Sequence, residues 1–134
     1  MKAIQQSIEF RDVSVKQLFE TYMDSRKHAA AIGDEATIQR RAGGKFSAFG
    51  KRHLIGKILH LVPNRMIVQT WRSLQRWRAG ELDSILVLTF EPTKRGARLN
   101  LLHIGVPDRD FDLYDQGWRE RYWKPWKKYF RESE

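Results

Sequence analysis

The sequence predicts an α+β domain in which a curved antiparallel sheet wraps around a long C-terminal helix. Three observations lead to this fold class: two short helical patterns follow a first strand, strand-like segments fill residues 35–104, and an aromatic amphipathic segment closes the chain. With 134 residues the chain has the length of one domain, so we expect a single domain over residues 1–134.

Residues 3–10 alternate between apolar and polar side chains, as the residues of a half-buried strand do. Ser14 and Gln17 form a capping-box pattern, and the apolar side chains behind them recur at helical spacing. Asp24 can begin a second short helix and Gly33 can end it. We therefore expect two short helices directly after the first strand.

The segments between residues 35 and 104 are rich in β-branched, aromatic and leucine residues and are separated by turn signals. These signals lie at Gly43-Gly44, Gly50-Lys51, Pro63-Asn64, Ala79-Gly80 and residues 92–96. Parallel strands would need helical crossovers, which this spacing does not provide. The pattern predicts five or six strands in an antiparallel meander.

The last segment, FDLYDQGWRERYWKPWKKYF at residues 111–130, has the spacing of an amphipathic helix. One broad face carries Phe111, Trp118, Tyr122, Trp123, Trp126, Tyr129 and Phe130. The opposite face carries Glu120, Arg121, Lys124, Lys127, Lys128 and Arg131. Pro125 lacks an amide hydrogen and crowds the carbonyl of Arg121, so a kink or break is expected there. A helix this aromatic needs a sheet to cover it, which is the helix-grip arrangement.

Side-chain direction on the strands decides which residues can line a cavity inside such a sheet. If Pro63-Asn64 closes a two-residue hairpin, one face carries Gly56, Ile58, His60, Ile67, Gln69 and Trp71. The other face carries Lys57 and Arg72, which indicates that it is the outer one. It also carries four apolar side chains, which argues the other way, and a register slip of one residue would reverse both faces. Trp77 falls in the following loop, where it can cap the cavity or contact a partner.

The remaining cavity candidates come from the last strand and the helix. Alternation places His103 on the inner face, and helical spacing places Tyr122 there. Asp115 and Arg119 are four residues apart within the aromatic face, so they can pair and orient the polar end of a ligand. The alternatives are a salt bridge at the cavity mouth or an arginine that reaches solvent. The predicted ligand-binding residues are thus His60, Gln69, Trp71, His103, Asp115, Arg119 and Tyr122.

The residue types give little support to catalysis. The chain has no cysteine, which excludes thiol nucleophiles and disulfides, and its histidines lack metal-ligand spacing. His103 with His60 and Asp115 can do acid–base work, but such histidines are more often hydrogen-bonded interior residues. We expect no metal site, no cofactor and no catalytic residue, and we lean against an enzyme.

The chain is strongly basic, with a formal net charge of +9. This charge favours anionic partners: nucleic acid, an acidic protein, a membrane surface or an anionic small molecule. The basic residues are scattered and the aromatic residues are needed for the core, so we do not expect nucleic-acid recognition. A signal-peptide pattern and a membrane-spanning stretch are absent from the sequence, which favours a cytoplasmic location.

Several motifs carry a resemblance to a known family. In order, they are GGKFSAFG (43–50), the run from Gly56 through LVPNRMIVQTWR (61–72), ELDSILVLTFE (81–91), LLHIGVPD (101–108) and GW followed by YWKPWKKYF (117–130). Together they resemble the domain homologous to the C-terminal part of activators of the ninety-kilodalton heat-shock protein ATPase, within the START-like (SRPBCC) superfamily. The resemblance covers nearly the whole chain.

The resemblance implies a helix-grip fold with a cavity between the sheet and the C-terminal helix. Relatives bind lipids, hormones or polyketides, and some act as cyclases or hydrolases. Eukaryotic co-chaperones of this kind carry a further N-terminal domain that does much of the chaperone binding. We therefore expect a non-catalytic module that holds a small, largely apolar ligand, with or without an anionic end. The alternatives are a protein-interaction module or chaperone-ATPase regulator, and then a cyclase- or hydrolase-type enzyme.

Overall fold

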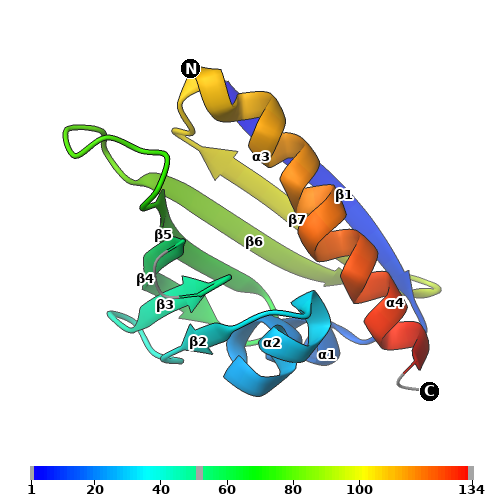
Figure 1. The fold of residues 1–134 in the computed structure, drawn as a ribbon. Helices are drawn as coiled ribbons and strands as arrows, with labels where there is room; N and C mark the ends of the chain where they lie inside the picture. Colours follow the sequence, from blue (N-terminus) through cyan, green and yellow to red (C-terminus); the bar gives the residue numbers. More distant parts are fainter. Residues whose placement is uncertain (1, 51–52, 133–134) are drawn as a thin grey trace.

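The computed structural model describes residues 2–50 and 53–132 (Figure 1). The turn expected at Gly50-Lys51 therefore lies partly outside the described residues. The first half contains β1 (Ala3–Arg11), α1 (Val15–Met23), α2 (Ser25–Ile32), β2 (Ala36–Ile38), β3 (Lys45–Ala48) and β4 (Leu54–Val62). The second half contains β5 (Met66–Ser73), β6 (Ser84–Pro92), β7 (Gly96–Ile104), η1 (Asp108–Asp110), α3 (Phe111–Trp118), η2 (Arg119–Trp123) and α4 (Lys124–Glu132).

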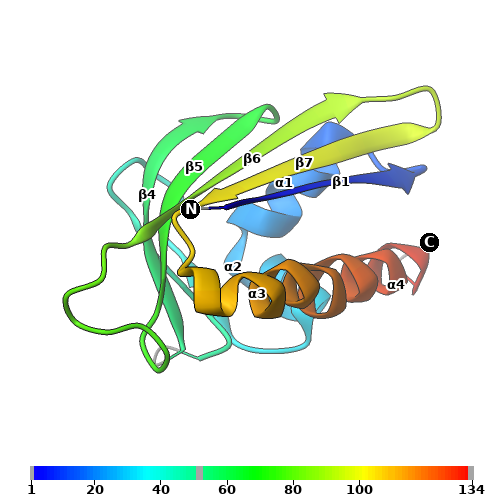
Figure 2. The same ribbon diagram turned by 90° about the horizontal axis from the view of Figure 1, so that it is seen from above.

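The strands of the described chain form one antiparallel sheet in the order β1-β7-β6-β5-β4-β3-β2. The C-terminal helices run along one side of this sheet, as the two views together show (Figures 1 and 2). The predicted α+β helix-grip fold is confirmed. Among the described residues, no helix is both long and apolar enough to cross a membrane.

The two short helices begin and end where the sequence predicts. The Ser14 hydroxyl accepts a hydrogen bond from the Gln17 amide at 3.1 Å, and the Gln17 side chain accepts one from the Ser14 amide at 2.8 Å. The Asp24 carboxylate accepts from the Lys27 amide, and Gly33 ends α2 at φ 70°. Because these caps satisfy free amides and carbonyls, both helices start and stop sharply.

Buried and more exposed side chains alternate along β6 and β7, and the buried ones form much of the core. Their buried residues are Ser84, Leu86, Leu88, Phe90, Ala97, Leu99, Leu101 and His103. The C-terminal helices cover this face with Trp118, Tyr122, Trp123 and Trp126, each at most 3% exposed. Burial of these large aromatic surfaces supplies much of the favourable free energy of folding.

The β4–β5 hairpin corrects the predicted direction of His60. Its loop has three residues, because Val62 pairs with Met66, and a bulge between Ile58 and His60 then restores the expected pairing of Ile58 with Gln69. Past the bulge, side chains on β4 change face. His60 is therefore exposed on the outer face, while Gln69 and Trp71 point inward as predicted.

The C-terminal helix is interrupted just before Pro125, where the sequence predicts a kink or break. Residues 119–123 form a π-helical turn, in which the Lys124 amide donates to the Arg119 carbonyl, five residues back. Proline cannot donate to the carbonyl of Arg121, so the α-helical hydrogen-bond pattern is already broken there. A π turn accommodates one extra residue and changes which side chains face the sheet beyond it.

Candidate ligand-binding pocket

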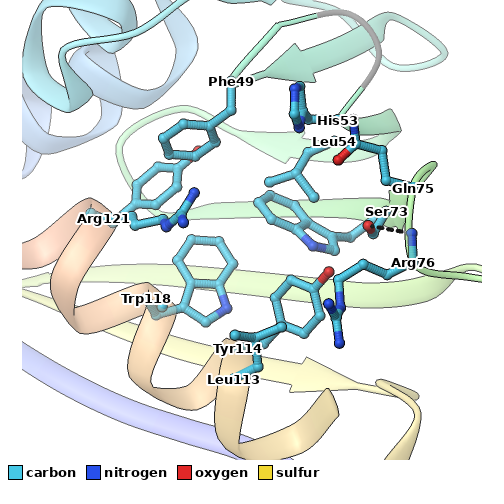
Figure 3. Close-up of a pocket in the computed structure, with 13 residues that line it drawn as sticks. Phe49, His53, Leu54, Ser73, Gln75, Arg76, Leu113, Tyr114, Trp118 and Arg121 are labelled. Atoms are coloured by element: carbon cyan, nitrogen blue, oxygen red, sulfur yellow. Dashed lines mark hydrogen bonds between the residues drawn. The ribbon is translucent and has the colours of Figure 1, made fainter. Parts of the chain in front are cut away.

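A pocket of about 350 Å³ opens between the sheet and the C-terminal helices (Figure 3). Its walls come from the segment before β4, the end of β5, the loop of residues 74–83, α3 and η2. The lining residues are Phe49, His53, Leu54, Trp71, Ser73, Gln75, Arg76, Leu113, Tyr114, Gly117, Trp118, Arg121 and Tyr122. Of the seven predicted site residues, Trp71 and Tyr122 line this pocket.

Five of the 13 described residues that line the pocket are phenylalanine, tryptophan or tyrosine. The rings of Trp71 and Trp118 lie 4.8 Å apart between centroids, and those of Trp118 and Tyr122 lie 4.7 Å apart. Phe49 contacts Tyr122 edge-on at 5.8 Å. Contacts of this kind fix the rings relative to one another, so the wall is preorganised.

Behind the pocket, Gln69 belongs to a buried chain of hydrogen bonds. His28 Nδ1 lies 2.7 Å from the carbonyl oxygen of Tyr22, which can only accept, so Nδ1 carries the proton and Nε2 accepts from the Tyr122 hydroxyl. The Tyr22 hydroxyl donates to Gln69 Oε1 at 2.6 Å. Burial lowers the pKa of His28 to about 4, so this imidazole is neutral near pH 7.

His103 belongs to a second buried chain. The Trp118 indole N–H donates to His103 Nδ1 at 3.1 Å, which places the proton of the neutral imidazole on Nε2. Nε2 then donates to the Ser84 hydroxyl at 2.8 Å, and Ser84 donates to the carbonyl of Trp71 at 2.7 Å. Burial lowers the pKa of His103 to about 3. With both nitrogens engaged, His103 holds Trp118 in place and does not face the pocket.

Asp115 and Arg119 form the predicted pair, with Arg119 Nη1 and Asp115 Oδ2 3.0 Å apart. The pair lies outside the pocket. Asp115 also accepts from the side chain of Gln6 on β1, and the other end of that amide accepts from Trp123. Arg119 is 58% exposed, so the pair is a surface salt bridge at the helix–β1 contact. The predicted role at the cavity is corrected accordingly.

The three side chains that were considered for acid–base work also lie apart from one another. His60 lies on the outer face of β4, His103 is committed to Trp118 and Ser84, and Asp115 faces β1. General acid–base work needs the groups within hydrogen-bond reach of one substrate. These three side chains do not meet that condition.

Sequence reasoning missed the polar rim of the pocket. Ser73 and Tyr114 contribute hydroxyls, and Arg76 and Arg121 contribute guanidinium groups on opposite sides of the pocket (Figure 3). Arg76 is paired with the buried carboxylate of Asp110 at 2.7 Å. Arg121 was assigned to the outer face of the helix, but at about 100° per residue it lies between Gly117 and Trp118, which both line the pocket. The sequence signal that could have found it is the spacing of Tyr114, Gly117, Trp118 and Arg121 at i, i+3, i+4 and i+7.

The loop of residues 74–83 is attached to the helix that faces it. In addition to the Arg76–Asp110 pair, Arg109 binds the carboxylate of Glu81 through both terminal nitrogens at 2.6 and 2.9 Å. Trp77 is 5% exposed and packs edge-on against Tyr114, which lines the pocket. Trp77 thus supports the pocket wall from behind.

Comparisons with known proteins show the family of this chain. Residues 12–131 match the family model described as "Activator of Hsp90 ATPase homolog 1-like protein". The chain belongs to this family. An uncharacterized protein of Schizosaccharomyces pombe is 30% identical over 119 residues, which are 89% of this chain and 34% of that protein. An activator of 90 kDa heat shock protein ATPase homolog from Dictyostelium discoideum is 29% identical over 102 residues, 75% of this chain and 26% of that protein.

The chain thus spans about a third or less of the length of these two relatives. Among solved structures, an HSP90 activator from Plasmodium falciparum superposes with a TM-score of 0.80 at 20% identity, covering 92% of both chains. A Mesorhizobium loti protein superposes with a TM-score of 0.82 at 15% identity, covering 99% of both. These likenesses show the START-like fold, and the family membership supports a binding or regulatory module of that fold.

Proposed function

We propose that the protein binds a small, largely apolar ligand in the pocket between the sheet and the C-terminal helices. The observation that carries the proposal is a preorganised cavity of about 350 Å³ with five aromatic rings in its lining. Small-molecule sites are concave and mostly apolar, with a few polar groups that orient the ligand. This volume is at the lower end of the range of about 300–1,000 Å³ for such sites. A compact molecule fits it better than a long acyl chain.

The hydrogen bonding of the polar groups around the pocket is compatible with a ligand that is mainly apolar. Those behind the wall are already satisfied, because Gln69, His28 and His103 have partners inside the protein. An apolar ligand therefore leaves no buried histidine or amide without a hydrogen bond. Trp71 differs, since its indole nitrogen has no acceptor among the described residues. That nitrogen is itself buried, so a ligand in the pocket contacts the Trp71 ring and not this donor.

Gly117 offers a direct test, since it lines the pocket and a Cβ built on it meets no atom within 4 Å. Gly117→Leu extends a side chain into this open space. Gln116→Leu is the matched control, because Gln116 is the exposed neighbour on the same helix and does not line the pocket. The probe is naphthalene-2-carboxamide, a flat neutral molecule, titrated while the indole N–H signals of Trp71 and Trp118 are followed by NMR.

We expect the amide to shift the indole signals of Trp71 and Trp118 in the unmodified protein and in Gln116→Leu. In Gly117→Leu the apparent affinity falls at least about tenfold, because the inserted side chain occupies the site. The indole signal of Trp126, which is buried away from the pocket lining, serves as an internal reference. The proposal would be overturned if neither this amide nor the carboxylate and phosphate with the same ring system shifted the indole signals of Trp71 and Trp118.

A second candidate function is regulation of a heat-shock ATPase, which the family membership and the Dictyostelium relative's name favour. The test is ATP turnover by a 90 kDa heat-shock protein with and without this chain. Because the chain has a net charge of +9, we expect any complex with an acidic partner to weaken as the salt concentration is raised. Unchanged turnover at low salt would remove this candidate.

A further inference from the structure

We infer that Arg121 makes the pocket selective for a ligand that carries one negative charge beside its aromatic body. This inference rests on the proposed ligand-binding function and adds the chemical class of the ligand. It assigns Arg121 as a specificity-determining residue.

The helix geometry brings Arg121 to the pocket. Leu113, Gly117 and Arg121 all line it at intervals of four residues. Tyr114 and Trp118 line the pocket as well, so the lining residues of this helix recur at the i, i+3, i+4 and i+7 spacing of one helical face. Arg121 lies near the middle of that face, between Gly117 and Trp118.

The charges at the pocket are unbalanced. Among the residues that the structure describes, the lining contains two arginines and no carboxylate. The charge of Arg76 is balanced by Asp110, whose side chain is 1% exposed and whose Oδ1 lies 2.7 Å from Arg76 Nη2. Arg121 has no acidic partner among the residues that the structure describes. Its guanidinium group lies over the Phe49 ring, whose centroid is 5.8 Å from the guanidinium carbon.

The contact with the Phe49 ring also orients the guanidinium group of Arg121. A guanidinium over an aromatic face is attracted by the ring, which restrains the side chain and keeps its N–H groups available at the edges. Those groups form a planar fork that matches the two oxygens of a carboxylate. Tyr122, which meets Phe49 edge-on, continues the aromatic surface toward Trp118. The arrangement suits a compact aromatic acid with its ring against Trp118 and its carboxylate at Arg121.

Because Arg121 is the one uncompensated arginine of the described lining, the pocket favours a monoanion over a dianion. A carboxylate is matched in charge by Arg121, whereas a phosphate monoester would bring a second negative charge that no other unpaired cation of the described lining balances. Both anions share the oxygen geometry that a guanidinium binds. The two are therefore separate arms of the test.

The probes are naphthalene-2-carboxylate, its neutral amide and 2-naphthyl phosphate, which share one ring system and differ in charge. Affinities are measured by calorimetry and by the indole N–H shifts of Trp71 and Trp118. The variants are Arg121→Gln and, as matched control, Arg119→Gln. Each removes one positive charge from the same helical turn, but only Arg121 lines the pocket.

For the unmodified protein we expect the carboxylate to bind about tenfold more tightly than the amide at low salt, the scale of a charge-assisted hydrogen bond at a partly exposed site. The phosphate binds more weakly than the carboxylate. Arg121→Gln removes the preference and leaves the affinity for the amide within about twofold. Arg119→Gln retains the preference.

Equal binding of carboxylate and amide by the unmodified protein would overturn the inference and leave the proposed function standing. A preference for the carboxylate that persists in Arg121→Gln would also overturn the inference, because another group would then recognise the carboxylate. An equal loss of the preference in Arg119→Gln would overturn it as well, because the preference would then depend on the net charge of the protein and not on Arg121. Tighter binding of the phosphate would overturn the assignment of a monoanion. Absence of binding by all three probes would overturn the proposed function itself.

Discussion

At the residue scale, the two buried histidines are held in place by hydrogen bonds on both sides of the ring. His28 and His103 are both fully shielded from solvent, and each uses both ring nitrogens in hydrogen bonds. One nitrogen of each ring accepts a hydrogen bond, so protonation would break a contact as well as place a charge in the core. Each is a neutral part of the scaffold that holds an aromatic pocket residue, Tyr122 or Trp118.

These histidines predict that the protein loses stability in mild acid. In the unfolded chain each binds a proton below about pH 6.5, whereas in the folded protein the pKa is about 4 for His28 and about 3 for His103. The unfolded state binds more protons in that window, so the free energy of unfolding falls as pH falls from 6.5 toward 4. The expected slope is about 1.4 kcal/mol per pH unit for each histidine once its unfolded form is protonated.

Urea unfolding between about pH 5 and 7 measures this slope. The variant His103→Gln removes one of the two groups and is expected to reduce the slope by about half, whatever its effect on stability at neutral pH. A free energy of unfolding that stays constant across this range would contradict the prediction.

Replacing either of two glycines with alanine is expected to change the stability of the protein, in opposite directions at the two positions. A Cβ at Gly117 meets open space inside a helix, where glycine is a poor helix former, so Gly117→Ala is expected to raise stability by about 0.5–1 kcal/mol. A Cβ at Gly56 would overlap the carbonyl oxygen of Thr70 on β5, so Gly56→Ala is expected to cost about 1–3 kcal/mol. Urea midpoints of the two variants check both signs. A stabilised Gly56→Ala would show that β4 and β5 are not pressed together as described.

At the element scale, the pocket depends on how the loop of residues 74–83 is held against the start of α3. Arg76 and Arg109 each reach an acid across this contact, but their partners differ in burial. The Asp110 side chain is 1% exposed, whereas that of Glu81 is 25% exposed. Glu81 can be solvated when its partner is removed, and Asp110 cannot.

We therefore expect Arg76→Ala to lower the midpoint of thermal unfolding more than Arg109→Ala does. The first change leaves a buried carboxylate without its cation, and the second leaves a carboxylate that water can reach. Thermal unfolding followed by tryptophan fluorescence measures both, with the double variant as a check on additivity. Equal losses would mean that Asp110 is solvated when Arg76 is absent.

At the scale of the whole molecule, the two candidate functions use different parts of the protein. Ligand binding needs the pocket, and regulation of an ATPase needs a surface that reaches the partner. Gly117→Leu fills the pocket and alters little of the outer surface, since Gly117 faces the cavity. We expect this variant to lose the naphthalene probe while keeping any effect on ATP turnover by a 90 kDa heat-shock protein. Loss of both together would show that the pocket ligand controls the partner contact.

The fold was predictable because it depends on local patterns. The capping residues Ser14 and Asp24, the alternation in β6 and β7 and the aromatic helix each act over a few residues and agree with one another. Trp71 was found because strand alternation is regular along β5, and Tyr122 was found because helical spacing keeps it on the aromatic face despite the π turn.

The sequence by itself therefore determined the α+β helix-grip fold, the family and two walls of the pocket. The tertiary structure decided the rest of the candidate site. A bulge in β4 turned His60 outward, and the packing of the helix against the sheet left the face that carries Arg121 over the pocket. The bulge adds one residue to the strand repeat, so it decides the face on which the side chains beyond it lie. Both outcomes are fixed by packing against neighbouring strands and helices, which short-range sequence patterns do not record.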